Sequence, residues 1–132
     1  MPTPSRLTAI VAGLTGALGV ATGAFGAHGL KQSLTPERLA WWHTGADYHL
    51  LHAIVLLAVA VAFGARTQHR LVKVAFWLMV GGIAVFSGSL YAMALTDVRA
   101  LGAITPIGGT ALIAAWVLLA VGLHRKHGQE TP

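Results

Sequence analysis

Four long apolar stretches, separated by short polar segments, dominate the pattern of this chain. They cover residues 7–27, 47–65, 72–96 and 101–123. A helix needs about 20 apolar residues to cross a hydrocarbon layer about 30 Å thick, and each stretch is long enough. The pattern predicts an all-α fold, a bundle of four transmembrane helices that forms one integral membrane domain over residues 1–132.

Composition agrees with a membrane protein. The chain is 55% hydrophobic and only 10% charged, whereas soluble domains carry about 25% charged residues. It has no cysteine, which excludes disulfides and thiolate metal sites. The sequence pI is near 10.5, but the basic residues flank the apolar stretches, as is typical of contacts with lipid. We therefore expect no nucleic-acid partner.

The basic residues also predict an orientation. Six of the nine lysines and arginines fall on one side of the predicted bundle, namely Arg6, Arg66, Arg70, Lys73, Arg125 and Lys126. Loops rich in lysine and arginine stay on the cytoplasmic side of a membrane. Both termini are therefore predicted to be cytoplasmic. Residues 28–46 and 97–100 are predicted to lie on the outer side.

The loop between the first two stretches carries signals for a helix of its own. Thr35, Pro36 and Glu37 supply an N-cap, a proline at the first helical position and an acid in the first turn. The adjacent Trp41 and Trp42 suit the headgroup level of a bilayer, and Gly45 offers a bend. We predict a short interfacial helix over residues 36–45.

Glycines in the first stretch indicate close helix packing. Five of them fall within an arc of about 140° on a helical wheel: Gly13, Gly16, Gly19, Gly23 and Gly26. In lipid, helices associate where small residues let two backbones approach closely. We expect this groove to pack either inside the monomer or against another copy.

Several polar residues are expected to come to one level of the bundle, near the outer surface. His52 is the strongest candidate for a functional residue, because an ionisable group inside a membrane is costly. Tyr48 lies four residues before it, on the same helix face. The predicted ligand-binding residues are His28, Tyr48, His52, Ser87, Ser89, Tyr91 and Thr105. An alternative interpretation makes His52 a neutral imidazole that only bonds helices together.

Metal and catalytic chemistry have little support in the sequence. His28, His43, His49 and His52 lie near one predicted surface, but no carboxylate or thiolate stands in register with them. The chain contains no Ser-x-x-Lys or His-Glu-x-x-His pattern and no phosphate-binding loop. We predict no metal, no cofactor and no catalytic residue.

Four local strings resemble one known family along most of the chain. They are Gly23 to His28, Thr44-Gly45 with Tyr48 and His52, Phe86 to Tyr91, and Thr105 to Gly109. These strings resemble the domain of unknown function 423 family, small bacterial inner-membrane proteins related to animal transmembrane protein 256. The resemblance implies a four-helix protein of the plasma (inner) membrane with no established role. The family pattern includes His28 and His52 but does not require His43 or His49.

Three hypotheses for function follow. The first is a non-enzymatic membrane protein with a polar pocket in the outer leaflet, which binds a lipid headgroup or a small amphipathic ligand. The second is a structural or assembly protein that packs through its glycine-rich helix face. The third is a subunit of an oligomeric channel or transporter. The expected partners are membrane lipids and either a second copy of the chain or another membrane protein.

Overall fold

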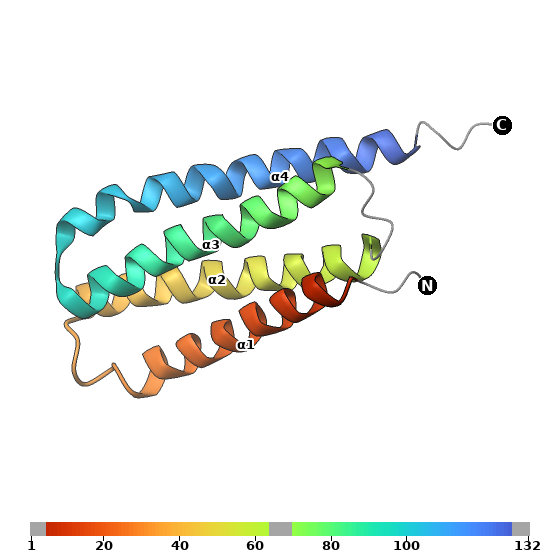
Figure 1. Cartoon of the computed structure of the whole chain (residues 1–132). Helices are drawn as coiled ribbons and strands as arrows, with labels where there is room; N and C mark the ends of the chain where they lie inside the picture. Colours follow the sequence, from red (N-terminus) through yellow and green to blue (C-terminus); the bar gives the residue numbers. More distant parts are fainter. Residues whose placement is uncertain (1–4, 64–69, 128–132) are drawn as a thin grey trace.

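The computed structural model describes residues 5–63 and 70–127, and these form antiparallel helices (Figure 1). The elements are α1 (Arg6–His28), α2 (Pro36–Phe63), α3 (Arg70–Thr96), the short 3-10 helix η2 (Arg99–Ala103) and α4 (Thr105–His127). All four α-helices are long and apolar enough to span a membrane. The predicted all-α fold with four membrane-spanning helices is therefore confirmed.

The two ends of the bundle differ in what they contain. One end, which we call the loop end, holds residues 29–35 and η2. The other, which we call the terminal end, holds the first turn of α1, the last turn of α4 and the facing ends of α2 and α3 (Figure 1). The predicted assignment of these ends to the outer and cytoplasmic sides stays a prediction.

The predicted interfacial helix is wrong, because α2 runs without a break from Pro36 to Phe63. Its first turns are held against α3 by Arg38, whose Nε and Nη2 donate to the carbonyls of Ala94 and Leu95 at 2.6 and 2.7 Å. These are terminal carbonyls of α3, which have no partner within their own helix. A cation at the C-terminus of a helix is also favoured by the helix dipole.

Trp42 and Gly45 are likewise part of the helix packing. The Trp42 side chain is buried, and its indole N–H donates to the Thr22 carbonyl of α1 at 2.8 Å. A Cβ added to Gly45 would lie 3.0 Å from the Tyr91 ring, so this glycine marks a close approach of α3. Two neighbouring helices therefore hold the segment in the bundle.

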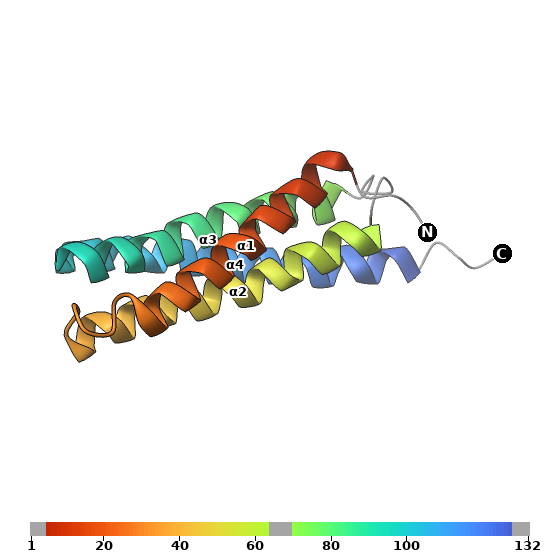
Figure 2. The same cartoon turned by 90° about the horizontal axis from the view of Figure 1, so that it is seen from below.

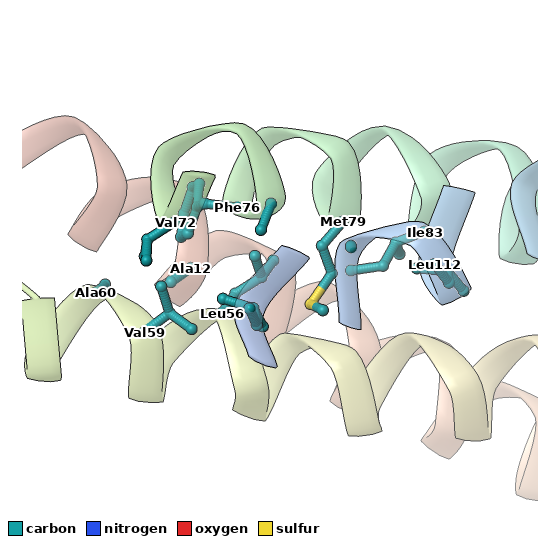
Figure 3. Close-up of a cluster of buried hydrophobic side chains, with 12 residues drawn as sticks. Ala12, Leu56, Val59, Ala60, Val72, Phe76, Met79, Ile83 and Leu112 are labelled. Carbon is teal, nitrogen blue, oxygen red and sulfur yellow. The ribbon is translucent and has the colours of Figure 1, made fainter. Parts of the chain in front are cut away.

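Each helix packs against the next one in the chain: α1 on α2, α2 on α3, and α3 on α4. Figure 1 shows the four in this order, and Figure 2 shows the crossing of α1 over α2. The apolar core lies toward the terminal end, where Leu56, Met79 and Val72 are fully buried (Figure 3). Ala12 brings α1 into this cluster.

Glycine allows the close contact between α3 and α4. A Cβ on Gly108 would collide with the backbone of Phe86, whose Cα would lie only 2.7 Å away. A Cβ added to Gly82 would likewise lie only 2.9 Å from Cγ of Leu112. These glycines set the separation of the two helices, since dispersion contacts between backbones hold helices together in lipid. The predicted fourth stretch began at residue 101, but α4 begins at Thr105 because η2 precedes it.

The glycine groove predicted on α1 divides into two parts. A Cβ on Gly19 would lie 3.2 Å from Leu50 Cα, and a Cβ on Gly26 would lie 2.7 Å from Trp42 Nε1. These two glycines therefore pack on α2. Gly13, Gly16 and Gly23 have nothing within 4 Å of an added Cβ among the residues that the structure describes. Gly13 is exposed, whereas Gly16 and Gly23 are half-buried at positions where α1 leaves room beside its neighbours.

This division predicts unequal effects of alanine along one helix. Gly26→Ala would force the buried Trp42 ring to move, and we expect the free energy of unfolding to fall by about 1–3 kcal/mol. Gly23→Ala is the matched control and should leave it unchanged. Thermal unfolding in detergent, followed by circular dichroism, measures both. Equal effects of the two substitutions would contradict the packing of α1 on α2.

Candidate functional site

The polar side chains inside the bundle lie between the loop end and the middle of the bundle. We use the name polar layer for Thr22, His49, His52, Ser87, Ser89, Tyr91 and Thr105. These residues come from all four helices. Three separate sets of hydrogen bonds join six of them, and each set connects two or three helices.

The first set is centred on Tyr91 of α3. Its hydroxyl lies 3.0 Å from Thr22 Oγ1 of α1 and 3.1 Å from His49 Nδ1 of α2. Thr22 Oγ1 in turn lies 3.1 Å from the Gly19 carbonyl. Because Thr22 Oγ1 donates its one hydrogen to the Gly19 carbonyl, the Tyr91 hydroxyl donates to Thr22 and accepts from the Nδ1–H of His49. One phenol group therefore ties three helices together.

The second set occupies both nitrogens of His52, which is buried. His52 Nδ1 lies 2.6 Å from the Tyr48 carbonyl one turn earlier, and Trp116 Nε1 of α4 donates to His52 Nε2 at 3.2 Å. An indole N–H only donates, so Nε2 has to accept. The proton of a neutral His52 is therefore on Nδ1, where it is donated to the Tyr48 carbonyl. This arrangement leaves His52 no free nitrogen for a metal or a ligand.

The third set joins α3 to the start of α4. Ser89 Oγ donates to the Phe86 carbonyl at 2.9 Å and lies 2.7 Å from Thr105 Oγ1. Since the Ser89 hydrogen is given to the carbonyl, the Thr105 hydroxyl donates to Ser89. Two residues predicted for a ligand site thus satisfy each other across a helix pair.

Ser87 differs from the rest of the polar layer. Its side chain is 1% exposed, and its Oγ has no hydrogen-bond partner among the described residues. A buried hydroxyl without a partner costs about 1–3 kcal/mol in proteins. Its position on α3 is two residues from Ser89 and four from Tyr91, so the group lies within the polar layer.

Two predicted site residues lie at the margin of the layer or outside it. The Tyr48 ring packs at 4.6 Å on Phe86 and at 5.8 Å on His52, with 45% of the residue exposed. His28 ends α1 as an exposed residue. The structure therefore brings five of the seven predicted residues into the layer, places Tyr48 beside it and leaves His28 at the surface.

Residues outside the predicted set complete these contacts. Thr22 and Trp116 each supply a partner from another helix, and His49 was discounted because the family pattern does not require it. A lone threonine or tryptophan in an apolar stretch is ordinary in a membrane helix. No sequence signal linked Trp116 to His52, since the two are 64 positions apart.

The histidines do not assemble a metal centre in the described part of the chain. No group of three or more His, Cys, Asp and Glu side chains lies close enough to hold a metal ion within residues 5–63 and 70–127. His49 and His52 bond to separate partners, Tyr91 and Trp116. The chemistry that the layer offers is hydrogen bonding between helices.

The two tyrosines of the chain provide a matched test of the polar layer. Tyr91→Phe removes the hydroxyl that joins Thr22 and His49, so we expect the free energy of unfolding to fall by about 0.5–2 kcal/mol. Tyr48→Phe should have no effect, because its hydroxyl makes no hydrogen bond to another described residue. Thermal unfolding in detergent compares them. A Tyr91→Phe protein as stable as wild type would contradict this role for the hydroxyl.

Comparisons with known proteins agree with the family resemblance. The sequence profile described as "Protein of unknown function (DUF423)" matches residues 22–109. The chain is 44% identical over 112 residues to the UPF0382 membrane protein YwdK of Bacillus subtilis, covering 85% of this chain and 91% of that protein. It is 38% identical over 121 residues to the UPF0382 inner membrane protein YgdD of Escherichia coli K12, covering 92% of each.

These relatives and the profile cover most of the helical bundle, including every residue of the polar layer. No solved structure matches the chain. The four apolar helices fit the membrane location that the relatives' names give. The chain therefore belongs to the DUF423 family of membrane proteins, whose function is unknown.

Proposed function

We propose that this protein is a non-enzymatic assembly protein of the membrane that associates with a second copy of itself through α1. The observation that supports this proposal is that the other described helices cover only part of the α1 surface. Only one face of α1 packs in the monomer, because among the described helices α1 approaches α2 alone at the backbone level. Of its apolar membrane-spanning window, 11% is buried, the lowest share of the four helices.

The exposed surface of α1 has two distinct parts. One part carries large side chains, Leu14, Leu18 and Phe25, each at least half exposed. The other part carries small residues: the half-buried Ala9 and the exposed Gly13, Ala17 and Ala24 lie within about 80° of one another on a helical wheel, with the exposed Val20 among them. Lipid tails contact large side chains such as leucine as well as they contact small ones. Small residues therefore have no advantage on a surface that faces lipid alone. They do favour a second helix, because they let its backbone approach.

The spacing supports a second copy as the partner. Ala9, Gly13 and Ala17 form two successive small-xxx-small pairs, a pattern that pairs well with its own image about a two-fold axis. The polar layer gives α1 a fixed position for this role. Trp42 and Tyr91 both bond to Thr22, so the loop end of α1 is held by two other helices.

A lipid or amphiphile pocket is the second candidate, and it has one specific observation in its favour. The unpartnered Ser87 hydroxyl is the sort of group that a bound ligand or water satisfies. The other hydroxyls and imidazoles of the polar layer already have protein partners, which favours their role as links between helices. An oligomeric channel or transporter stays a prediction that no observation on this chain favours.

Single cysteines test self-association cleanly, since the natural chain contains none. We expect Ala17→Cys and Ala24→Cys to form disulfide-linked dimers when membranes are oxidised, because both positions lie on the small-residue face. Leu18→Cys lies one residue from Ala17 but about 100° around the helix, and should cross-link weakly. Gly sites on the same face give a further check: Gly13→Leu should abolish the Ala24→Cys dimer without unfolding the monomer.

Non-reducing gel electrophoresis measures the dimer yield. Equal yields from Ala17→Cys and Leu18→Cys would indicate random collision and overturn the proposal. So would the absence of any dimer from the face residues in membranes that retain the folded protein.

A further inference from the structure

The terminal end of the bundle contains a cavity that the polar layer does not explain. It has a volume of about 200 Å³ and lies between the first turn of α1, the second half of α2 and the first turns of α3. Its walls are mostly apolar, from Leu7, Val59, Ala60, Phe76 and Trp77, while Ser5, Thr8 and Lys73 supply the polar groups. Val59, Ala60 and Phe76 belong to the core cluster of Figure 3, so the cavity reaches the protein core.

A second depression lies beside the first and shares two residues with it. It is a shallow groove of about 520 Å³ lined by Arg70, Lys73, Val74, Trp77 and Leu78. Lys73 and Trp77 line both hollows. They are four residues apart on α3 and therefore stand one above the other on the same helix face. A cation and an aromatic ring thus separate two apolar hollows.

The charge of this region is positive. Lys73 and Arg70 are exposed on the first turns of α3, and Arg6 is exposed at the start of α1. The sequence carries no acidic residue before Glu37 and none between Asp47 and Asp97. Those three acids lie in the half of the bundle near the loop end, and the fourth, Glu130, lies outside the described residues. An anionic group is therefore the complementary partner at the terminal end.

We propose that this region binds an anionic phospholipid, with its phosphate at Lys73 and one acyl chain in each hollow. The volume of this cavity, about 200 Å³, is smaller than the roughly 300–1,000 Å³ of sites that enclose whole small molecules. A cavity of this size suits part of one acyl chain. A diacyl lipid has two chains below one headgroup, and the two hollows both border on Lys73 and Trp77. Trp77, 38% exposed, suits the boundary between chains and headgroup.

Lysine is suited to this role because its flexible apolar stem can lie along the cavity wall while the ammonium group reaches the headgroup level. Each basic residue near an anionic membrane surface contributes about 1 kcal/mol, which corresponds to about a fivefold change in affinity. This site lies at the other end of the bundle from the polar layer. It is independent of self-association through the small-residue face of α1.

The test is a titration of the purified full-length protein with two lipids of identical chains, palmitoyl-oleoyl phosphatidylglycerol and palmitoyl-oleoyl phosphatidylcholine, read by native mass spectrometry. We expect the wild type to bind phosphatidylglycerol more tightly. Lys73→Gln should weaken phosphatidylglycerol binding about fivefold and leave phosphatidylcholine unaffected. Lys31→Gln, an exposed lysine at the loop end, removes the same charge and should change neither.

A second pair of variants tests the cavity separately from the charge. Ala60→Leu extends a side chain into the cavity and should reduce the binding of both lipids, whereas Ala84→Leu, at an exposed position on α3 that lines neither hollow, should not. Circular dichroism identifies any variant that has lost its helical fold. Equal binding of the two lipids by wild type would overturn the proposal. A folded Lys73→Gln or Ala60→Leu protein that binds as wild type would also overturn it.

Discussion

The architecture depends on one constraint: a polar group inside a bilayer finds no water and has to be satisfied by another part of the protein. In this chain, polar side chains of one helix form hydrogen bonds with polar groups of another helix. Trp116 of α4 bonds His52 of α2, and Tyr91 of α3 joins Thr22 of α1 to His49 of α2. Two of these links, Thr22 to Tyr91 and His52 to Trp116, join helices that are not neighbours in the packing order. They convert a row of consecutively packed helices into one bundle.

Both halves of the molecule have apolar packing, and they differ in their polar contacts. Near the loop end, hydrogen bonds and the Arg38 cap on α3 add to an apolar cluster of Leu30, Trp42 and Ala94. Near the terminal end, the contacts are apolar and depend on small residues such as Gly122, where an added Cβ would lie 2.9 Å from Val72 Cγ2. The terminal end carries its positive charge at the surface and an apolar cavity beneath it. At the loop end, polar groups therefore bond to other helices within the bundle. At the terminal end, the exposed basic groups are available to lipid headgroups.

The sequence was sufficient for the number of helices and, to within a few residues, for the bounds of α1 and α3, because transmembrane length and hydropathy are local properties. It misjudged the start of α2. Trp42 has the same local signature whether it lies at a membrane surface or donates to a carbonyl of α1, and only tertiary contacts distinguish the two. The fourth apolar stretch contains a change of helix type that the sequence did not show, because its first residues form η2 and α4 begins at Thr105.

The candidate site was predictable only in part. Helix periodicity and topology predicted one level for His52, Ser89, Tyr91 and Thr105; in the structure Ser89 bonds to Thr105 at the start of α4, whereas His52 bonds to Trp116 near the middle of α4. Their partners were not predictable, because the Thr22 to Tyr91 and His52 to Trp116 pairs depend on how helices rotate about their axes. Sequence periodicity assigns residues to a face but does not say which face meets which helix.

The central claim is that the polar layer, apart from Ser87, is satisfied within the bundle and links its helices. Nitrogen-15 NMR of histidine-labelled protein in membranes tests this most directly at His52, with His52→Asn to assign the signal. The structure predicts a neutral ring with its proton on Nδ1, and a Nε2 signal that shifts when Trp116→Phe removes the indole donor. A proton on Nε2, a charged ring, or a Nε2 signal unaffected by Trp116→Phe would contradict this account.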